Sequence, residues 1–288
     1  MMILYFQLFL IASLVSVACS LPGTFLVLRG TALMSDAISH SVLLGIVLMF
    51  FITHNIHSPW MFLGATLIGL LTVSAAELLI KTKRIFLDTT IGLIFPLFFS
   101  IAVILINRYA QTVHMDTDAV FLGELAFAPF ETCALFGYNL GPVSLWTMLA
   151  ILLINIFCIK LFYKELVIST FDLNQAEILG YRPHWINYLL MTLTCITIIG
   201  SFKTAGSILV IAFMIIPPAT AFLITDHISH MIVVSSLLAL LSTIIGCSLA
   251  HLINVSITGA IATTGGVLFF IILFLAGSKD SKSLTDRS

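Results

Sequence analysis

The sequence predicts an all-α membrane protein, a polytopic bundle of transmembrane helices, and two observations lead to this class. Of the 288 residues, 60% are hydrophobic and only 9% are charged, whereas a soluble domain carries about 25% charged residues. The charged residues also lie between apolar blocks whose lengths are close to the roughly 20 residues that a helix needs to cross a bilayer. Because so few polar side chains cannot cover a soluble surface, the chain must be an integral membrane protein.

The apolar blocks predict eight to nine membrane spans. The first block is uncharged and has neither a basic leader nor a small-residue cleavage site, so it is a span and not a signal peptide. Only residues 201–204 separate the sixth and seventh blocks, and fusion of two neighbours or a re-entrant segment would leave eight spans. The nine expected spans are residues 3–28, 32–53, 59–80, 89–107, 143–162, 186–202, 205–225, 231–253 and 257–276.

The basic residues set the orientation, because cytoplasmic loops carry the excess of Lys and Arg. With the first residue outside, Arg108 and Lys203 fall on the outer side and the other ten basic residues fall inside. We therefore expect one transmembrane domain over residues 1–278 and a cytoplasmic tail over residues 279–288. The ten inner residues are Arg29, Lys81, Lys83, Arg84, Lys160, Lys164, Arg182, Lys279, Lys282 and Arg287.

Two ionisable residues, Asp36 and His40, lie inside the second expected span. Their i,i+4 spacing places both side chains on one helix face. A carboxylate within a membrane is costly and usually marks a substrate or ion pathway, although an ion pair that fixes helix packing would also explain the two residues. Ser35 and Ser39 either orient this pair by hydrogen bonds or are small residues that allow close helix approach.

The chemistry of this pair suits a divalent transition metal. A carboxylate oxygen and an imidazole nitrogen accept manganese(II), iron(II) or zinc(II), and the lack of a nearby Cys argues against copper(I). Two ligands from one helix form an incomplete set, as a transport site requires, and a second copy of the chain or water would supply the rest. We predict no catalytic residues and no permanently bound cofactor, since the sequence contains no nucleotide-binding or hydrolase motif.

The inner connection over residues 163–185 has the sequence pattern of a short helix. Asp172 or Asn174 can cap its N-terminus, Gly180 is a suitable C-terminal cap, and Pro183 prevents continuation. Such a helix on a cytoplasmic loop is typical of a docking element, and the alternative is a simple connector.

Three motifs together resemble the membrane permease subunits of metal-ion ABC importers, the manganese, zinc and iron class. The first runs from Gly23 to Gly30 and continues from Ser35 to Gly45. The second is the inner-loop pattern Phe171-Asp172-x-x-x-Ala176-x-x-x-Gly180, which is similar to the ATPase-coupling loop of that class. The third runs from Thr204 to Ala221 and contains Pro217 and Pro218.

The resemblance implies a homodimeric or heterodimeric permease in a bacterial inner membrane. Two cytoplasmic ATP-binding subunits would hydrolyse ATP and dock on the inner loops, and an extracytoplasmic metal-binding protein would deliver the ion. Asp36 and His40 would contact the metal in transit. Phe171, Asp172, Ala176 and Gly180 would couple the chain to the ATPase.

Two further features and three rival functions stay open. Pro217 and Pro218 indicate either a static kink or a hinge. Glu77 is expected to pair with Lys81 at i,i+4, with a role in the exit path as the alternative. The rivals are a secondary metal transporter that uses Asp36 or Glu77 as a proton relay, a siderophore or vitamin permease of related architecture, and an intramembrane metalloprotease.

Overall fold

A computed structural model of the chain describes residues 2–54, 60–109, 125, 128–129, 132–135 and 138–285, and the predicted all-α transmembrane class is confirmed. The elements are α1 (Met2–Leu28), α2 (Met34–Thr53), α3 (Trp60–Lys81), α4 (Leu87–Tyr109), β1 (Thr132–Leu135), β2 (Tyr138–Pro142), α6 (Val143–Leu161), α7 (Tyr163–Phe171), α8 (Leu173–Ile178), α9 (Pro183–Ala205), α10 (Ser207–Phe222), α11 (Ile228–Ile253) and α12 (Ile257–Thr285).

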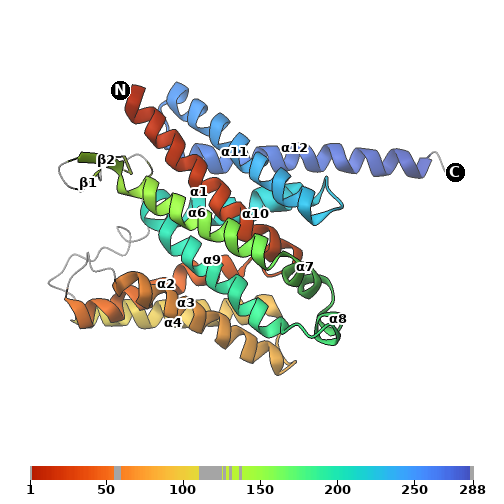
Figure 1. Cartoon of the computed structure of the whole chain (residues 1–288), viewed down its shortest axis with the longest axis horizontal. Helices are drawn as coiled ribbons and strands as arrows, with labels where there is room; N and C mark the ends of the chain where they lie inside the picture. Colours follow the sequence, from red (N-terminus) through yellow and green to blue (C-terminus); the bar gives the residue numbers. More distant parts are fainter. Residues whose placement is uncertain are drawn as a thin grey trace.

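Among the described residues, eight helices are long and apolar enough to cross a membrane. The expected seventh span is instead the shorter helix α10, which has 16 residues. The break before α10 lies at Gly206, after residues 201–204 where the sequence suggested it, because Gly206 adopts a φ of 76° that favours glycine. The N- and C-termini lie at opposite ends of the bundle (Figure 1).

The helices form two groups joined by α9 (Figure 1). One group is built around α1, which packs against α6, α10 and α11, and α12 packs on α10 and α11. The other group consists of α2, α3 and α4. Helix α9 contacts α1, α6 and α10 of the first group and α2 and α3 of the second, so it connects the two groups.

A proline in α1 is compensated by a side chain from α6. Pro22 has no N–H and cannot donate to the carbonyl of Ala18, four residues earlier. The buried Asn155 donates from Nδ2 to that carbonyl at 3.0 Å, and also to Thr197 Oγ1 of α9 at 2.8 Å. Within a membrane, a carbonyl freed by proline needs such a partner on a neighbouring helix, so Asn155 joins α1, α6 and α9.

Glycines allow two close helix contacts. A Cβ added at Gly45 in α2 would lie 2.4 Å from the carbonyl oxygen of Gly64 in α3. A Cβ added at Gly23 in α1 would lie 2.3 Å from the carbonyl oxygen of Met214 in α10. The Met214 carbonyl is four residues before Pro218 and therefore lacks its usual helical donor. Helix α10 therefore places the Met214 carbonyl, which lacks its helical donor, directly against the backbone of Gly23.

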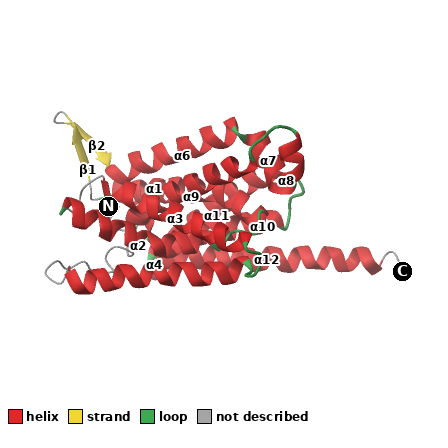
Figure 2. Ribbon diagram, turned by 90° about the horizontal axis from the view of Figure 1, so that it is seen from below, coloured by secondary structure: helices red, strands yellow, loops and turns green. Residues whose placement is uncertain are grey.

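The two ends of the bundle differ in structure (Figure 2). The N-terminus lies at the same end as an antiparallel hairpin formed by β1 and β2, which the sequence did not predict. Helices α7 and α8 lie at the opposite end, which is also the end toward which α12 extends (Figure 2). The predicted inner connection therefore contains two helices, and only the second was expected.

Candidate functional site

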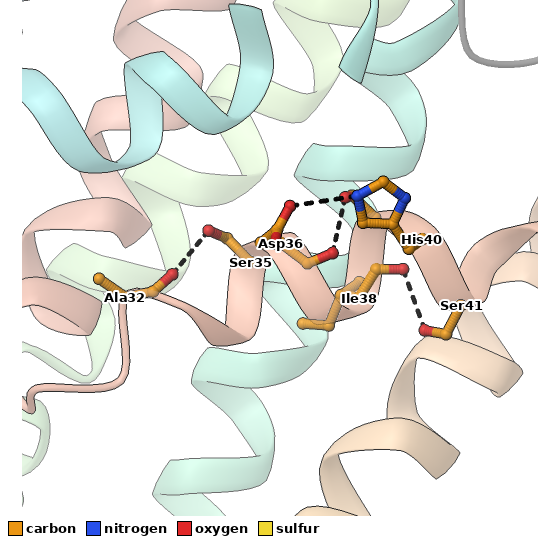
Figure 3. A network of polar contacts seen from close by, with 7 residues as sticks. Ala32, Ser35, Asp36, Ile38, His40 and Ser41 are labelled. Atoms are coloured by element: carbon orange, nitrogen blue, oxygen red, sulfur yellow. Dashed lines mark hydrogen bonds and ion pairs between the residues drawn. The ribbon is translucent and has the colours of Figure 1, made fainter. Parts of the chain in front are cut away.

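The predicted pair Asp36 and His40 lies at the beginning of α2 (Figure 3). Asp36 is in the first turn of the helix, and its Oδ1 is 3.3 Å from Nε2 of His40. The i,i+4 spacing thus brings the carboxylate and the imidazole into direct contact, as the sequence predicts. A negative charge in the first turn also interacts favourably with the positive end of the helix dipole.

The pair is half-exposed in the single chain, on the side of α2 that faces α4. The side chains of Asp36 and His40 are 37% and 38% exposed, respectively. The His40 ring lies 5.5 Å from the ring of Phe95 and 6.1 Å from that of Phe99, both on α4. The two aromatic rings therefore cover part of the imidazole. More than a third of the side-chain surface of both Asp36 and His40 stays exposed.

The hydroxyl groups of Ser35 and Ser39 bond to the helix backbone. Ser35 Oγ donates to the carbonyl of Ala32 at 2.7 Å (Figure 3). Ser39 Oγ donates to the carbonyl of Asp36 at 2.7 Å. Both serines are fully buried. Their hydrogens are therefore not directed at the carboxylate or imidazole, and the geometry favours the packing alternative of the two that the sequence left open.

The ligand set on one chain is incomplete. Within the described ranges, no group of three or more His, Cys, Asp or Glu side chains could hold a metal ion. Asp36 and His40 thus offer one oxygen and one nitrogen, and a transition metal ion needs at least four ligands. The remaining ligands would have to come from water or from another chain.

Residues 171–180, for which the sequence predicts a coupling role, have the predicted helix caps. Asp172 accepts a hydrogen bond from the backbone N–H of Gln175 at 3.0 Å and is the N-cap of α8. Gly180 has a φ of 83°, and the N–H of Tyr181 donates to the carbonyl of Ala176 at 3.0 Å. These contacts form a Schellman C-terminal cap. Ala176 is fully buried, whereas Phe171 is 68% exposed, so the segment is fixed on one side and presents an aromatic ring on the other.

A second polar cluster, which sequence reasoning missed, surrounds Arg29 just after α1. Its Nε donates to Thr170 Oγ1 at 3.1 Å, one terminal nitrogen donates to Ser169 Oγ at 3.0 Å, and the other donates to Asn187 Oδ1 at 2.9 Å. Asn187 Nδ2 in turn donates to Glu77 Oε1. We call these five residues the Arg29 cluster.

The expected pairing of Glu77 with Lys81 is wrong, since Glu77 accepts its hydrogen bond from Asn187 instead. The physical reason is burial. Lys81 is exposed, and an exposed ion pair contributes little, whereas a partly buried carboxylate needs a nearby donor. The other atom of this carboxylate, Oε2, is buried and has no hydrogen-bond partner among the described residues.

The two candidate hinge prolines lie away from the Asp36–His40 pair. Pro217 and Pro218 are buried inside α10, and Pro217 lines a small void with Ser242 of α11 and Gly265 of α12. This proline therefore faces the α11–α12 side of the bundle, and the structure does not bring it to the pair.

The chain is similar to known permeases over nearly its whole length. A family model described as the ABC 3 transport family matches residues 2–276. The chain is 41% identical to the manganese transport system membrane protein MntD of Bacillus subtilis, over 92% of this chain and 90% of the relative. It is 49% identical to the zinc transport system membrane protein TroD of Treponema pallidum, over 91% of this chain and 71% of the relative.

A solved structure agrees with the family match. The structure titled PsaBC from Streptococcus pneumoniae in complex with Fab has a chain that is 26% identical, with a TM-score of 0.78 over 97% of this chain and 94% of that one. The sequence motifs, the helical bundle and these similarities agree with one another. The chain therefore belongs to the ABC 3 transport family of polytopic membrane permeases, which confirms its resemblance to the permease subunits of metal-ion ABC importers.

Proposed function

We propose that this chain is the membrane permease subunit of an ABC importer that carries a divalent transition metal into the cytoplasm of a bacterium. Manganese, zinc and iron are the candidate ions, and Asp36 and His40 bind the ion in transit. The relatives named above support this class, since one is named for manganese and the other for zinc. They do not select between the two ions, and the mixed oxygen and nitrogen donor set accepts both.

The observation that carries the proposal is the separation of 3.3 Å between Asp36 Oδ1 and His40 Nε2. Ligand atoms about 2.1 Å from a metal are about 3.0 Å apart at an octahedral angle and about 3.4 Å apart at a tetrahedral angle. The two atoms therefore already have a spacing suited to sharing one ion, and binding requires little movement of α2. Two protein ligands also hold the ion weakly enough for release.

The exposure of the pair indicates a second permease chain. A carboxylate that is 37% exposed in a single chain would lie against lipid if lipid surrounded it, which is unfavourable for an ionisable group. A second permease chain on this side of α2 and α4 would replace lipid by protein and water, and would supply further ligands. We therefore place Asp36 and His40 at a permease dimer interface, made of two identical or two related chains.

Energy enters through partner subunits that bind the α7–α8 end of the bundle. The exposed side chains of Phe171 and Ile178, at 68% and 85% exposure, give this end an apolar surface that fits a groove on a cytoplasmic ATP-binding subunit. Phe171, Asp172, Ala176 and Gly180 form the coupling segment, and the C-terminus lies on the same cytoplasmic side.

An extracytoplasmic metal-binding protein delivers the ion at the opposite end. Pro217 and Pro218 serve as a hinge in α10 during alternating access.

Metal uptake by the reconstituted importer tests this function. We expect Asp36→Asn and His40→Gln each to lower ATP-driven uptake of radioactive manganese or zinc at least about tenfold, because the first removes the negative charge and the second removes the imidazole nitrogen that suits these ions. The matched control is Asp88→Asn, since Asp88 is also in the first turn of a helix but is exposed on α4. Wild-type uptake by both variants would refute the site. Uptake driven by a pH gradient without ATP-binding subunits would instead support a secondary transporter.

A further inference from the structure

We infer that Arg29 is a positioning residue that transmits the displacement of α7 and α8 to α2, the helix that carries Asp36 and His40. This inference rests on the proposed function, because it assigns the route by which the ATP-binding subunits act on the metal site. Arg29 makes contacts in three directions.

The first direction is along the chain into α2. Arg29 follows the last residue of α1, and only residues 30–33 separate it from Met34, where α2 begins. These residues form a tight turn, in which Thr31 N–H donates to the carbonyl of Leu26 at 2.9 Å and Met34 N–H donates to the carbonyl of Thr31 at 3.0 Å. Because the link is hydrogen-bonded at both ends, a displacement of Arg29 is carried into the first turn of α2.

The second direction is toward the coupling segment. Thr170 and Ser169, which accept from the guanidinium at 3.1 and 3.0 Å, lie in the last turn of α7. Only Asp172 separates the end of α7 from the start of α8, so the two hydroxyl groups move with α8. The planar guanidinium binds both at once, and no other side chain type offers this geometry.

The third direction is through α9 to α3. Arg29 donates to Asn187 at 2.9 Å, and Asn187 donates to Glu77, so the amide lies between a cation and an anion. The guanidinium is half-buried, and burial lowers the pKa of Arg29 to about 10, which leaves it protonated at neutral pH. The Arg29 cluster thus connects the coupling segment with both helix groups.

The contacts of Arg29 join segments that are far apart in the sequence. Arg29 uses three of its five N–H groups in the contacts above, two toward α7 and one toward α9. A displacement of α7 and α8 therefore acts directly on the guanidinium, and through Asn187 it reaches Glu77 on α3.

The test measures coupling in the complete importer, reconstituted with its ATP-binding subunits. Metal uptake and ATP hydrolysis are recorded together, and complex assembly and thermal stability are recorded separately. We expect Arg29→Met to lower uptake per ATP hydrolysed at least about tenfold in the assembled complex. Arg29→Lys should restore little, because an ammonium cannot bind three separated acceptors as the guanidinium does. Arg84→Met is the control, since Arg84 is exposed on the same side.

A charge rearrangement tests the connection to α3. Asn187→Asp alone sets two carboxylates against each other and should lower the coupling ratio. The double substitution Asn187→Asp with Glu77→Gln should restore it, because a carboxylate then faces Arg29 and an amide donates to that carboxylate. If Arg29→Met fails to assemble, this pair of variants decides the inference, and no difference between the single and double variants would overturn it.

A readout that needs no metal separates this inference from the proposed function. A cysteine is introduced at the exposed Leu33, beside the start of α2, and its labelling by a membrane-impermeant maleimide is measured with and without ATP and vanadate. With Arg29 present we expect the labelling rate to change at least about threefold, and with Arg29→Met we expect no change. A nucleotide-dependent change that persists without Arg29 would overturn the inference. A wild-type importer that takes up no divalent metal would overturn only the proposed function.

Discussion

The contact between α2 and α3 at Gly45 makes the sharpest stability prediction. Replacing Gly45 by Ala would place a Cβ 2.4 Å from the Gly64 carbonyl oxygen and 2.7 Å from Ala65 Cα. Both neighbours are backbone atoms, so no side chain can rotate away. Reaching an ordinary contact of 3.4 Å requires the two helices to separate by about 1 Å, and overpacking of this kind costs about 1–3 kcal/mol.

Gly92→Ala is a matched control for this prediction. Gly92 lies in α4, and an added Cβ there would meet nothing within 4 Å. Both substitutions gain the same helix propensity, about 1 kcal/mol, so the difference between them isolates the contact. We expect Gly45→Ala to lower the Tm of the purified permease relative to Gly92→Ala by about 5 °C, measured by loss of the monodisperse peak after heating. Metal uptake should fall too, because α2 carries Asp36 and His40. Equal Tm values for the two variants would refute this account of the contact between α2 and α3.

Three further substitutions test other contacts. Asn155→Leu should destabilise the permease by about 1–3 kcal/mol, because the Ala18 carbonyl loses its donor. The loss of stability, measured by thermal unfolding, should be smaller when Pro22→Ala is added. Additive effects of the two substitutions would contradict this account. Gly180→Val should uncouple ATP hydrolysis from uptake, since a β-branched residue does not tolerate a φ of 83°. Gly180→Asn should keep the two coupled. Equal ratios of uptake to ATP hydrolysis in the two variants would contradict a role for the C-terminal cap in coupling. Asp172→Ala should weaken binding of the ATP-binding subunit about fivefold, because it removes an N-cap that contributes about 1 kcal/mol. Titration with that subunit measures the affinity. Equal affinities of the Asp172→Ser and Asp172→Ala variants would exclude capping as the cause.

The sequence predicts well what depends on neighbouring residues. The apolar blocks between charges located most membrane helices, because the length of a span is set by the bilayer. The contact of Asp36 with His40 follows from helix periodicity, and the N-cap at Asp172 and the C-cap at Gly180 follow from local backbone chemistry. The predicted functions of these residues still await the experiments above.

Contacts between distant residues were not predictable from one sequence. In the sequence Arg29 is one of the inner basic residues and part of the first motif, and neither fact indicates its partners. Ser169, Thr170 and Asn187 lie 140, 141 and 158 residues away. Glu77 was assigned to its neighbour Lys81 because periodicity reports on one helix at a time. The signal that could have indicated the Arg29 cluster is an arginine between two motif glycines at the end of a span.

The central position of α9 has a consequence for how the protein is made. Among the eight long helices it is the least hydrophobic and the most buried, so lipid alone is a poor solvent for it. During synthesis it leaves the ribosome after α1, α2, α3 and α6 and before α10, the remaining helix among the neighbours named above. Membrane insertion of α9 should therefore depend on those earlier segments, and a nascent chain that lacks them should release α9 into the aqueous phase.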